Sequence, residues 1–183
     1  MVLLVIDVQA GITDERLYRF KQFEENLKNL IDTSRKCGVE VIYVRHDDGP
    51  GSGFSKGDAD FEIYEGVAPK SGEKIFEKNV NSAFHDSTGL DKYLKSKNVK
   101  KVITVGLQTD YCIDATVKSG FERGYEMIVP EYCNSTRSNE YMDAETTYEF
   151  FNMNMWPGRY ATCPTVSDTL KMIQNYNQVF GKI

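Results

Sequence analysis

The fold of this chain is indicated most clearly by one stretch, Val102-Ile103-Thr104-Val105-Gly106-Leu107-Gln108-Thr109-Asp110-Tyr111-Cys112. Its first half is a short apolar run with several β-branched residues, which predicts a strand buried on both faces. Its second half is polar and leads into a helical pattern that extends to about Arg123. A buried strand followed directly by a helix is the repeating unit of a parallel sheet covered by helices.

The same alternation of strands and helices continues through the rest of the sequence. The predicted strands are 2–8, 39–44, 102–106, 125–129 and 160–163, with a less regular extended segment at 73–78. The predicted helices are 20–34 (with Gly38 as its C-terminal cap), 90–97, 110–123, 138–152 and 167–176 (with Ser167 as its N-cap). A glycine-rich loop occupies 47–57. This order predicts a three-layer α/β/α sandwich on a mostly parallel sheet, in one domain over residues 1–183.

Composition narrows the class of protein. The 183 residues contain 22 Lys and Arg against 27 Asp and Glu, a net charge of −5, and are 40% hydrophobic. This size and apolar content are typical of one globular domain and argue against disorder. The mild negative charge offers no basic surface for a nucleic acid or an anionic membrane. We therefore expect neither as a partner.

Cysteine usage and the N-terminal segment bear on localisation. Cys37, Cys112, Cys133 and Cys163 lack the spacing of a zinc knuckle or a redox pair. Two disulfides remain arithmetically possible. The first apolar run is too short for a signal peptide or a membrane span. We therefore expect a cytoplasmic protein with reduced thiols.

Reactive side chains follow the ends of several predicted strands. Asp7 ends the first strand, His46 follows the second, Lys78 follows the extended segment, and Cys112 follows the strand at 102–106. The carboxyl ends of parallel strands meet at one edge of the sheet, where ligands usually bind. The sequence therefore predicts that an acid, a cation and a thiol meet there.

Each of these residues also has an ordinary explanation. With Thr109 as N-cap, Cys112 would lie in the first turn of a helix, where the helix dipole lowers a thiol pKa. It could equally be a small buried apolar residue. Asp7 could cap a loop, and Lys78 could be a solvated surface lysine. Together the three would supply a nucleophile, a proton acceptor and a cation.

Three segments together resemble the isochorismatase-like cysteine hydrolases. They are Asp7-Val8-Gln9, Lys78-Asn79-Val80-Asn81-Ser82-Ala83-Phe84 and the run from Gly106 to Thr116. They occur in the family's order and span nearly the whole chain. The resemblance implies a six-stranded Rossmann-like sheet and a homo-oligomer, either a dimer or a tetramer.

The resemblance also implies a site and a reaction. Asp7, Lys78 and Cys112 match the family's catalytic triad, and a cis peptide is implied between Leu107 and Gln108. The backbone N–H groups of Gln108 and Cys112 would form an oxyanion hole. The implied reaction is hydrolysis of an amide or related C–N bond in a small-molecule substrate, through a thioester and with no organic cofactor. Two alternatives remain: hydrolysis of a vinyl ether through Asp7 alone, and a catalytically idle relative that only binds.

The metal site and the substrate pocket are less well defined by the resemblance. Nicotinamidases of the family hold zinc through an Asp-x-His segment and a further His, whereas this chain has Arg45-His46-Asp47-Asp48 there. We therefore predict no metal. The residues that we expect near the substrate are Gln9, His46, Phe54, Phe84 and Tyr111.

Overall fold

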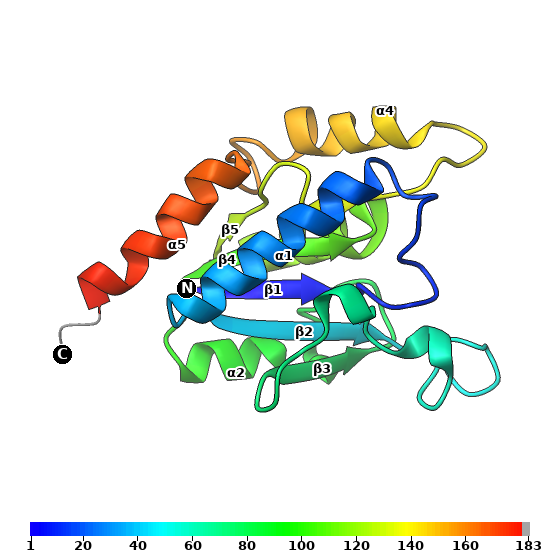
Figure 1. Ribbon diagram of the computed structural model, residues 1–183, viewed down its shortest axis with the longest axis horizontal. Coiled ribbons are helices and arrows are strands. Elements are labelled where there is room, and N and C mark those ends of the chain that lie inside the picture. Colours follow the sequence, from blue (N-terminus) through cyan, green and yellow to red (C-terminus); the bar gives the residue numbers. More distant parts are fainter. Residues whose placement is uncertain (181–183) are drawn as a thin grey trace.

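A parallel six-stranded sheet forms the centre of the protein (Figure 1). The computed structural model describes residues 1–180, with side chains through Tyr176. The strands are β1 (Val2–Ile6), β2 (Glu40–His46), β3 (Lys74–Lys78), β4 (Lys101–Leu107), β5 (Glu126–Ile128) and β6 (Asn134–Ser135). Five strands run in the order β3-β2-β1-β4-β5, and β6 pairs with the end of β4. The predicted fold class is confirmed.

Helices cover both faces of this sheet. They are α1 (Phe20–Lys36), α2 (Leu90–Ser96), α3 (Asp114–Glu122), α4 (Ala144–Glu149) and α5 (Val166–Phe180). Two π-helical segments, Thr109–Ile113 and Phe150–Met155, precede α3 and follow α4. Short 3₁₀ turns lie at Ala59–Phe61, Glu65–Val67 and Asp86–Thr88. No helix within residues 1–180 combines the length and apolar content that crossing a membrane requires.

Strand β1 explains why the chain forms three layers. Its side chains alternate between two apolar cores, Leu3 and Val5 facing α1 and α5, and Val2, Leu4 and Ile6 facing α2 and α3. Each of these side chains is almost completely buried. Full burial of one such side chain contributes roughly 1.5 to 3 kcal/mol. A strand that is apolar at every position therefore needs a helix layer on each face.

Gly106 lets β4 approach β1 at the carboxyl edge of the sheet. It pairs with Ile6 and has a φ of +124°. A Cβ atom built on Gly106 would lie 2.0 Å from the Ile6 carbonyl oxygen. Only glycine fits this close approach, which brings the end of β4 beside the end of β1.

Several predicted elements differ from the observed ones. The sixth strand is Asn134–Ser135, and the segment predicted at 160–163 contributes only a single bridge between Thr162 and Ile128. The helix predicted from Ser138 starts at Ala144, because Asp143 accepts a hydrogen bond from the Thr146 N–H and caps it.

Both predicted N-caps are also wrong. Helix α5 is capped by Thr165, whose hydroxyl accepts a hydrogen bond from the Asp168 N–H, and Ser167 lies inside the helix. Thr109 lies inside the helical segment that follows Gln108, and its hydroxyl donates to Asn134 Oδ1 at 2.7 Å. By contrast, Gly38 has a φ of +67° just after α1, as predicted for a C-terminal cap.

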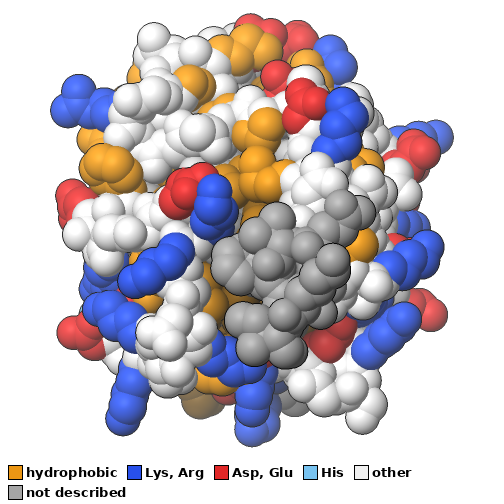
Figure 2. Space-filling view, turned by 90° about the vertical axis from the view of Figure 1, so that its left-hand side faces the viewer, with side chains coloured by type: hydrophobic (Ala, Val, Ile, Leu, Met, Phe, Trp, Pro, Cys, Tyr) orange, Lys and Arg blue, Asp and Glu red, His pale blue; other side chains and the backbone are white. Residues whose placement is uncertain are grey.

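The two ends of the sheet differ in character. The arrowheads of β1, β2 and β3 in Figure 1 point to the side where the loop after β2 extends. Figure 2 shows the opposite end, with charged side chains of both signs around apolar ones and no histidine in view. The residues singled out from the sequence lie at the first of these ends.

Candidate active site

The Lys78 ammonium lies at the centre of the candidate site. Its Nζ is 2.7 Å from Asp7 Oδ2 and 3.2 Å from Cys112 Sγ, and it lies 2.9 Å from His46 Nδ1. The Lys78 side chain is completely buried and that of Asp7 is 2% exposed. The structure therefore brings the acid, the cation and the thiol together. Lys78 is not a surface lysine.

The ends of three strands create this convergence. Lys78 is the last residue of β3, and the parallel register pairs it with His46 at the end of β2. Asp7 follows β1 directly and has a left-handed backbone, with a φ of +51°. Its N–H donates to the Val44 carbonyl at 2.9 Å. Aspartate adopts this conformation more readily than most residues, and such positions are typical of functional sites.

The turn after β4 places Cys112. The peptide bond between Leu107 and Gln108 is cis. The N–H groups of Tyr111 and Ile113 both donate to the Gln108 carbonyl, which closes the turn. Asn134 accepts from the Thr109 hydroxyl and bonds Asn152, so buried polar contacts support the turn from below. Cys112 is 9% exposed.

Burial shapes the protonation of the site. It raises the pKa of the Asp7 carboxyl above its ordinary value, and Lys78 opposes this shift. Burial also raises the pKa of the Cys112 thiol to about 12, with the charge of Asp7 adding to the rise and Lys78 opposing it. The helix N-terminus predicts a lowered thiol pKa, and this prediction is wrong, because burial of the thiol raises its pKa. Asp7 Oδ1 has no hydrogen-bond partner among the described residues. This oxygen is therefore available to accept a proton.

A metal ion does not fit this arrangement. Asp7, His46 and Cys112 each bring one ligand-type atom within 4.8 Å of the others. The Lys78 ammonium, however, already contacts all three. The second ring nitrogen of His46, Nε2, lies 3.1 Å from Asp48 Oδ1. A cationic side chain thus occupies the place where a metal ion would have to bind.

A hollow opens onto the thiol. It has a volume of about 270 Å³ and is lined by Asp7, Ile12, His46, Asp48, Phe54, Asn81, Gln108, Tyr111 and Cys112. Phe54 reaches it from the glycine-rich loop, and the Tyr111 side chain is 53% exposed at the surface. Three of the predicted pocket residues, His46, Phe54 and Tyr111, therefore line the hollow.

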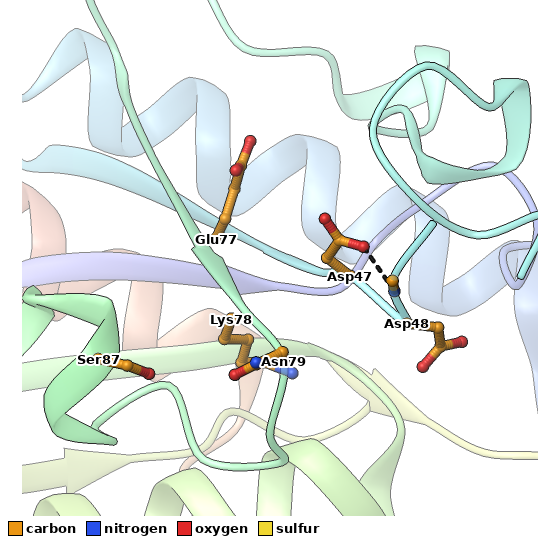
Figure 3. A pocket seen from close by; sticks show the side chains of 7 residues that line it. Asp47, Asp48, Glu77, Lys78, Asn79 and Ser87 are labelled. Atoms are coloured by element: carbon orange, nitrogen blue, oxygen red, sulfur yellow. Dashed lines mark hydrogen bonds between the residues drawn. The ribbon is translucent and has the colours of Figure 1, made fainter. Parts of the chain in front are cut away.

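A larger hollow of about 570 Å³ lies next to the first and shares Asp48 with it. Figure 3 shows its lining, with Glu77 and Lys78 leaving β3 on opposite sides. Glu77 pairs with Arg45, and Asp47 accepts a hydrogen bond from the Gly49 N–H. No cysteine is among the described residues that line it. The smaller hollow is therefore the one that gives access to the Cys112 thiol.

Two predicted pocket residues lie elsewhere. Phe84 is completely buried and stacks on Tyr125, with ring centroids 5.1 Å apart, because it faces the core between the sheet and α3. Gln9 is also completely buried. Its amide accepts a hydrogen bond from the His46 N–H and donates to the carbonyls of His46 and Phe61. Gln9 therefore binds the backbone at the end of β2 and is not among the residues that line the hollow.

Sequence reasoning missed three lining residues. Asn81 belongs to the segment that contains Lys78, and its Oδ1 lies 3.9 Å from Cys112 Sγ, so the motif itself could have indicated it. Asp48 is the last residue of the segment that was compared with the zinc-binding motif. Ile12 has no sequence signal, because its position depends on a loop held by the Gly11 N–H and the Asp60 carbonyl.

Comparisons with known proteins agree with this fold. The isochorismatase domain model matches residues 1–156. The chain is 30% identical to the uncharacterized isochorismatase family protein YddQ of Bacillus subtilis, over 92% of this chain and 98% of that protein. It is 28% identical to nicotinamidase 3 of Arabidopsis thaliana, over 78% and 76%. A cysteine hydrolase structure from Pseudomonas syringae pv. phaseolicola 1448A superposes with a TM-score of 0.87 at 22% identity, covering 95% and 92% of the two chains.

Proposed function

The chain belongs to the isochorismatase family, and we propose that it is a cysteine-dependent hydrolase of a small amide or a related C–N bond. The observation that carries this proposal is the position of the Lys78 ammonium, 2.7 Å from Asp7 Oδ2 and 3.2 Å from Cys112 Sγ. One cation faces both the group that must accept a proton and the group that must lose it.

The first proton transfer, from the Cys112 thiol to Asp7, does not change the total charge of the site. Before it, the negative charge is on Asp7 and the thiol is neutral. After it, Asp7 is neutral and the negative charge is on Cys112 Sγ. Lys78 contacts both positions, so the negative charge stays next to the Lys78 ammonium before and after the transfer. Because burial raises the pKa of Asp7, its carboxylate is a better proton acceptor than an exposed aspartate.

The remaining steps follow acyl-transfer chemistry. The thiolate attacks the carbonyl carbon, and the oxyanion is stabilised by the N–H groups of Gln108 and Cys112. Asp7 returns its proton to the nitrogen, the C–N bond breaks, and an amine or ammonia leaves. Asp7 then takes a proton from water, whose oxygen attacks the thioester. The C–S bond breaks, the acyl group leaves as a carboxylic acid, and Asp7 returns its proton to the Cys112 sulfur.

Two features favour a small amide as the substrate. A volume of about 270 Å³ is at the low end of ligand pockets, which suits a molecule of few heavy atoms. One relative carries the name nicotinamidase. Cleavage of a vinyl ether by Asp7 would leave the buried thiol beside Lys78 without a use.

A substrate panel tests the proposal. Nicotinamide, carbamoyl compounds, ureidoacrylate and streptothricin-type lactams would be assayed for release of ammonia or amine. We expect turnover of at least one compound, and we expect Cys112→Ala to lower kcat about a thousandfold or more because it removes the nucleophile. Cys37→Ala, which changes a half-buried cysteine outside the site, is the matched control.

Mass spectrometry of the quenched wild-type reaction should detect an acyl group on Cys112. Full activity of Cys112→Ala would overturn the covalent route and favour Asp7 acting alone. A protein that hydrolyses none of the compounds, and that forms no acyl adduct on Cys112, would be an idle relative.

A further inference from the structure

The Lys78 ammonium has three acceptors, and the proposed triad accounts for only two. A protonated lysine carries three N–H donors and no acceptor. Asp7 Oδ2 and Cys112 Sγ accept two of these hydrogens. The third partner is His46 Nδ1, at 2.9 Å. This nitrogen must therefore carry a lone pair.

Asp48 favours the tautomer that this contact requires. With a lone pair on Nδ1, the neutral imidazole carries its proton on Nε2. Nε2 lies 3.1 Å from Asp48 Oδ1, so the Nε2–H donates to a carboxylate. A carboxylate at this nitrogen fixes the ring orientation and keeps Nδ1 free to accept.

The backbone around His46 is held as firmly as its ring. The His46 N–H donates to Gln9 Oε1 at 2.7 Å, and Gln9 Nε2 donates to the His46 carbonyl at 3.0 Å. His46 is also the register partner of Lys78 across β2 and β3. Side chains at paired positions of a parallel sheet leave on the same face. The imidazole and the ammonium are therefore neighbours because of the sheet itself.

We propose that His46 is a positioning residue of the reaction, which holds the Lys78 ammonium between Asp7 and Cys112 by accepting its third N–H. Asp48 supports it by fixing the ring tautomer. The inference rests on the proposed function for its catalytic consequence. Without this acceptor the ammonium can rotate toward solvent or the larger hollow, and the thiolate loses part of its stabilisation.

Two substitutions of His46 distinguish the effect of losing the hydrogen-bond acceptor from the effect of changing the side-chain volume. His46→Asn keeps an oxygen at the same distance from the backbone as Nδ1, whereas His46→Leu keeps volume and loses the acceptor. We expect His46→Leu to lower kcat about a hundredfold, since small displacements of a catalytic group have effects of this size. His46→Asn should recover most of that loss.

A matched pair of variants controls for the general effect of removing a histidine. His85→Leu and His85→Asn change the other histidine, whose Nδ1 contacts the Ser87 hydroxyl at the surface. Both should keep wild-type kcat. Asp48→Ala should lower kcat in the same direction as His46→Leu but by only a few fold, since Asp48 is half exposed.

Alkylation of Cys112 gives a readout that does not depend on the substrate. At pH 8, iodoacetamide should modify Cys112 about tenfold more slowly in His46→Leu than in wild type or His46→Asn, because the thiolate is less stabilised. A raised KM with unchanged kcat and alkylation would overturn the inference, since His46 would then only contact substrate. If wild type hydrolyses no amide while this order of alkylation rates holds, the proposed function fails and the positioning role stands.

Discussion

Two lysine–carboxylate pairs lie at opposite ends of this sheet and have nearly the same length. At the amino end, Lys101 Nζ lies 2.8 Å from Glu126 Oε1, and the side chains are 43% and 50% exposed. At the carboxyl end, Lys78 Nζ lies 2.7 Å from Asp7 Oδ2, and the side chains are 0% and 2% exposed. Distance alone therefore does not distinguish the two pairs.

Burial is what distinguishes them. Two charges 4 Å apart interact by about 1 kcal/mol in water and by about 4 kcal/mol at an effective dielectric constant of 20. Water screens the exposed pair, whereas the buried pair depends on its own partners for solvation. In the proposed reaction, the Asp7 carboxylate of the buried pair takes a proton from a third group, the Cys112 thiol. The parallel strands therefore bring a lysine and a carboxylate together at both ends of the sheet. Only at the carboxyl end is the pair buried beside a thiol.

The largest expected effect is on stability, from Lys78→Met. Removing one partner of a buried pair typically costs about 3 to 5 kcal/mol, because the other charge is left unpaired. In this variant the pKa of Asp7 should rise further, since Lys78 opposes the rise in wild type. The folded state then binds more protons than the unfolded state. Stability is therefore retained below the unfolded pKa of about 4 and is lost as pH rises through the folded pKa.

Urea denaturation of Lys78→Met at pH 5 and pH 8 measures this loss. The deficit relative to wild type should be larger at pH 8. The double variant Asp7→Asn/Lys78→Met provides the control and should lack the extra loss at pH 8. A deficit in Lys78→Met that is equal at the two pH values would argue that Asp7 is not left charged.

A smaller effect is expected on the Cys112 thiol, from Asp7→Asn. Asp7 raises the pKa of this thiol, which is about 12, and Lys78 lowers it. With the negative charge removed, Lys78 acts alone against desolvation and the thiol pKa should fall. The thiolate fraction at pH 9 should increase about tenfold, which corresponds to a shift of one unit or about 1.4 kcal/mol.

Thiolate absorbance near 240 nm follows this titration, and Cys112→Ala in the same background identifies the signal. Two other thiols provide an internal reference, since burial raises the pKa of Cys163 to about 12 and holds the pKa of Cys133 well above its ordinary value. An unchanged Cys112 titration in Asp7→Asn would show that the two groups do not interact electrostatically.

The smallest effect is expected at the exposed pair, from Lys101→Met. Exposed ion pairs contribute about 0 to 1 kcal/mol, so the urea midpoint should move little and kcat should stay at the wild-type value. Added salt should shrink even this difference, because it screens the charges. A loss comparable to that of Lys78→Met would mean that burial is not the property that separates the two ends.

Much of the fold could be predicted from local pattern. The apolar runs of β1, β2 and β4 could be identified from the sequence, as could the stripe of α1 and its cap at Gly38. The sixth strand could not. Asn134–Ser135 is two residues long and polar, and it is a strand only because β4 offers it free backbone groups. The caps at Thr165 and Asp143 were also missed, because neighbouring polar residues compete for the same role.

The candidate site divides in a similar way. Asp7, Lys78 and Cys112 could be identified because each follows a strand and belongs to a motif. Phe84 belongs to a motif as well, yet the structure buries it against Tyr125 in the core. Gln9 follows Asp7 closely but turns inward to clamp His46. A motif indicates which residues matter, but not which face of the backbone their side chains leave from.

The amino-acid sequence by itself determined the order of strands and helices, the apolar faces that must be covered, and the edge of the sheet where reactive groups gather. These depend on spacing and hydrophobicity, which are local properties of the chain. Only the tertiary structure decided the number of partners around the Lys78 ammonium, the role of His46 among them, and the direction in which the pKa of the Cys112 thiol is shifted. These depend on burial and on contacts between residues far apart in the chain, such as Asp7, Lys78 and Cys112.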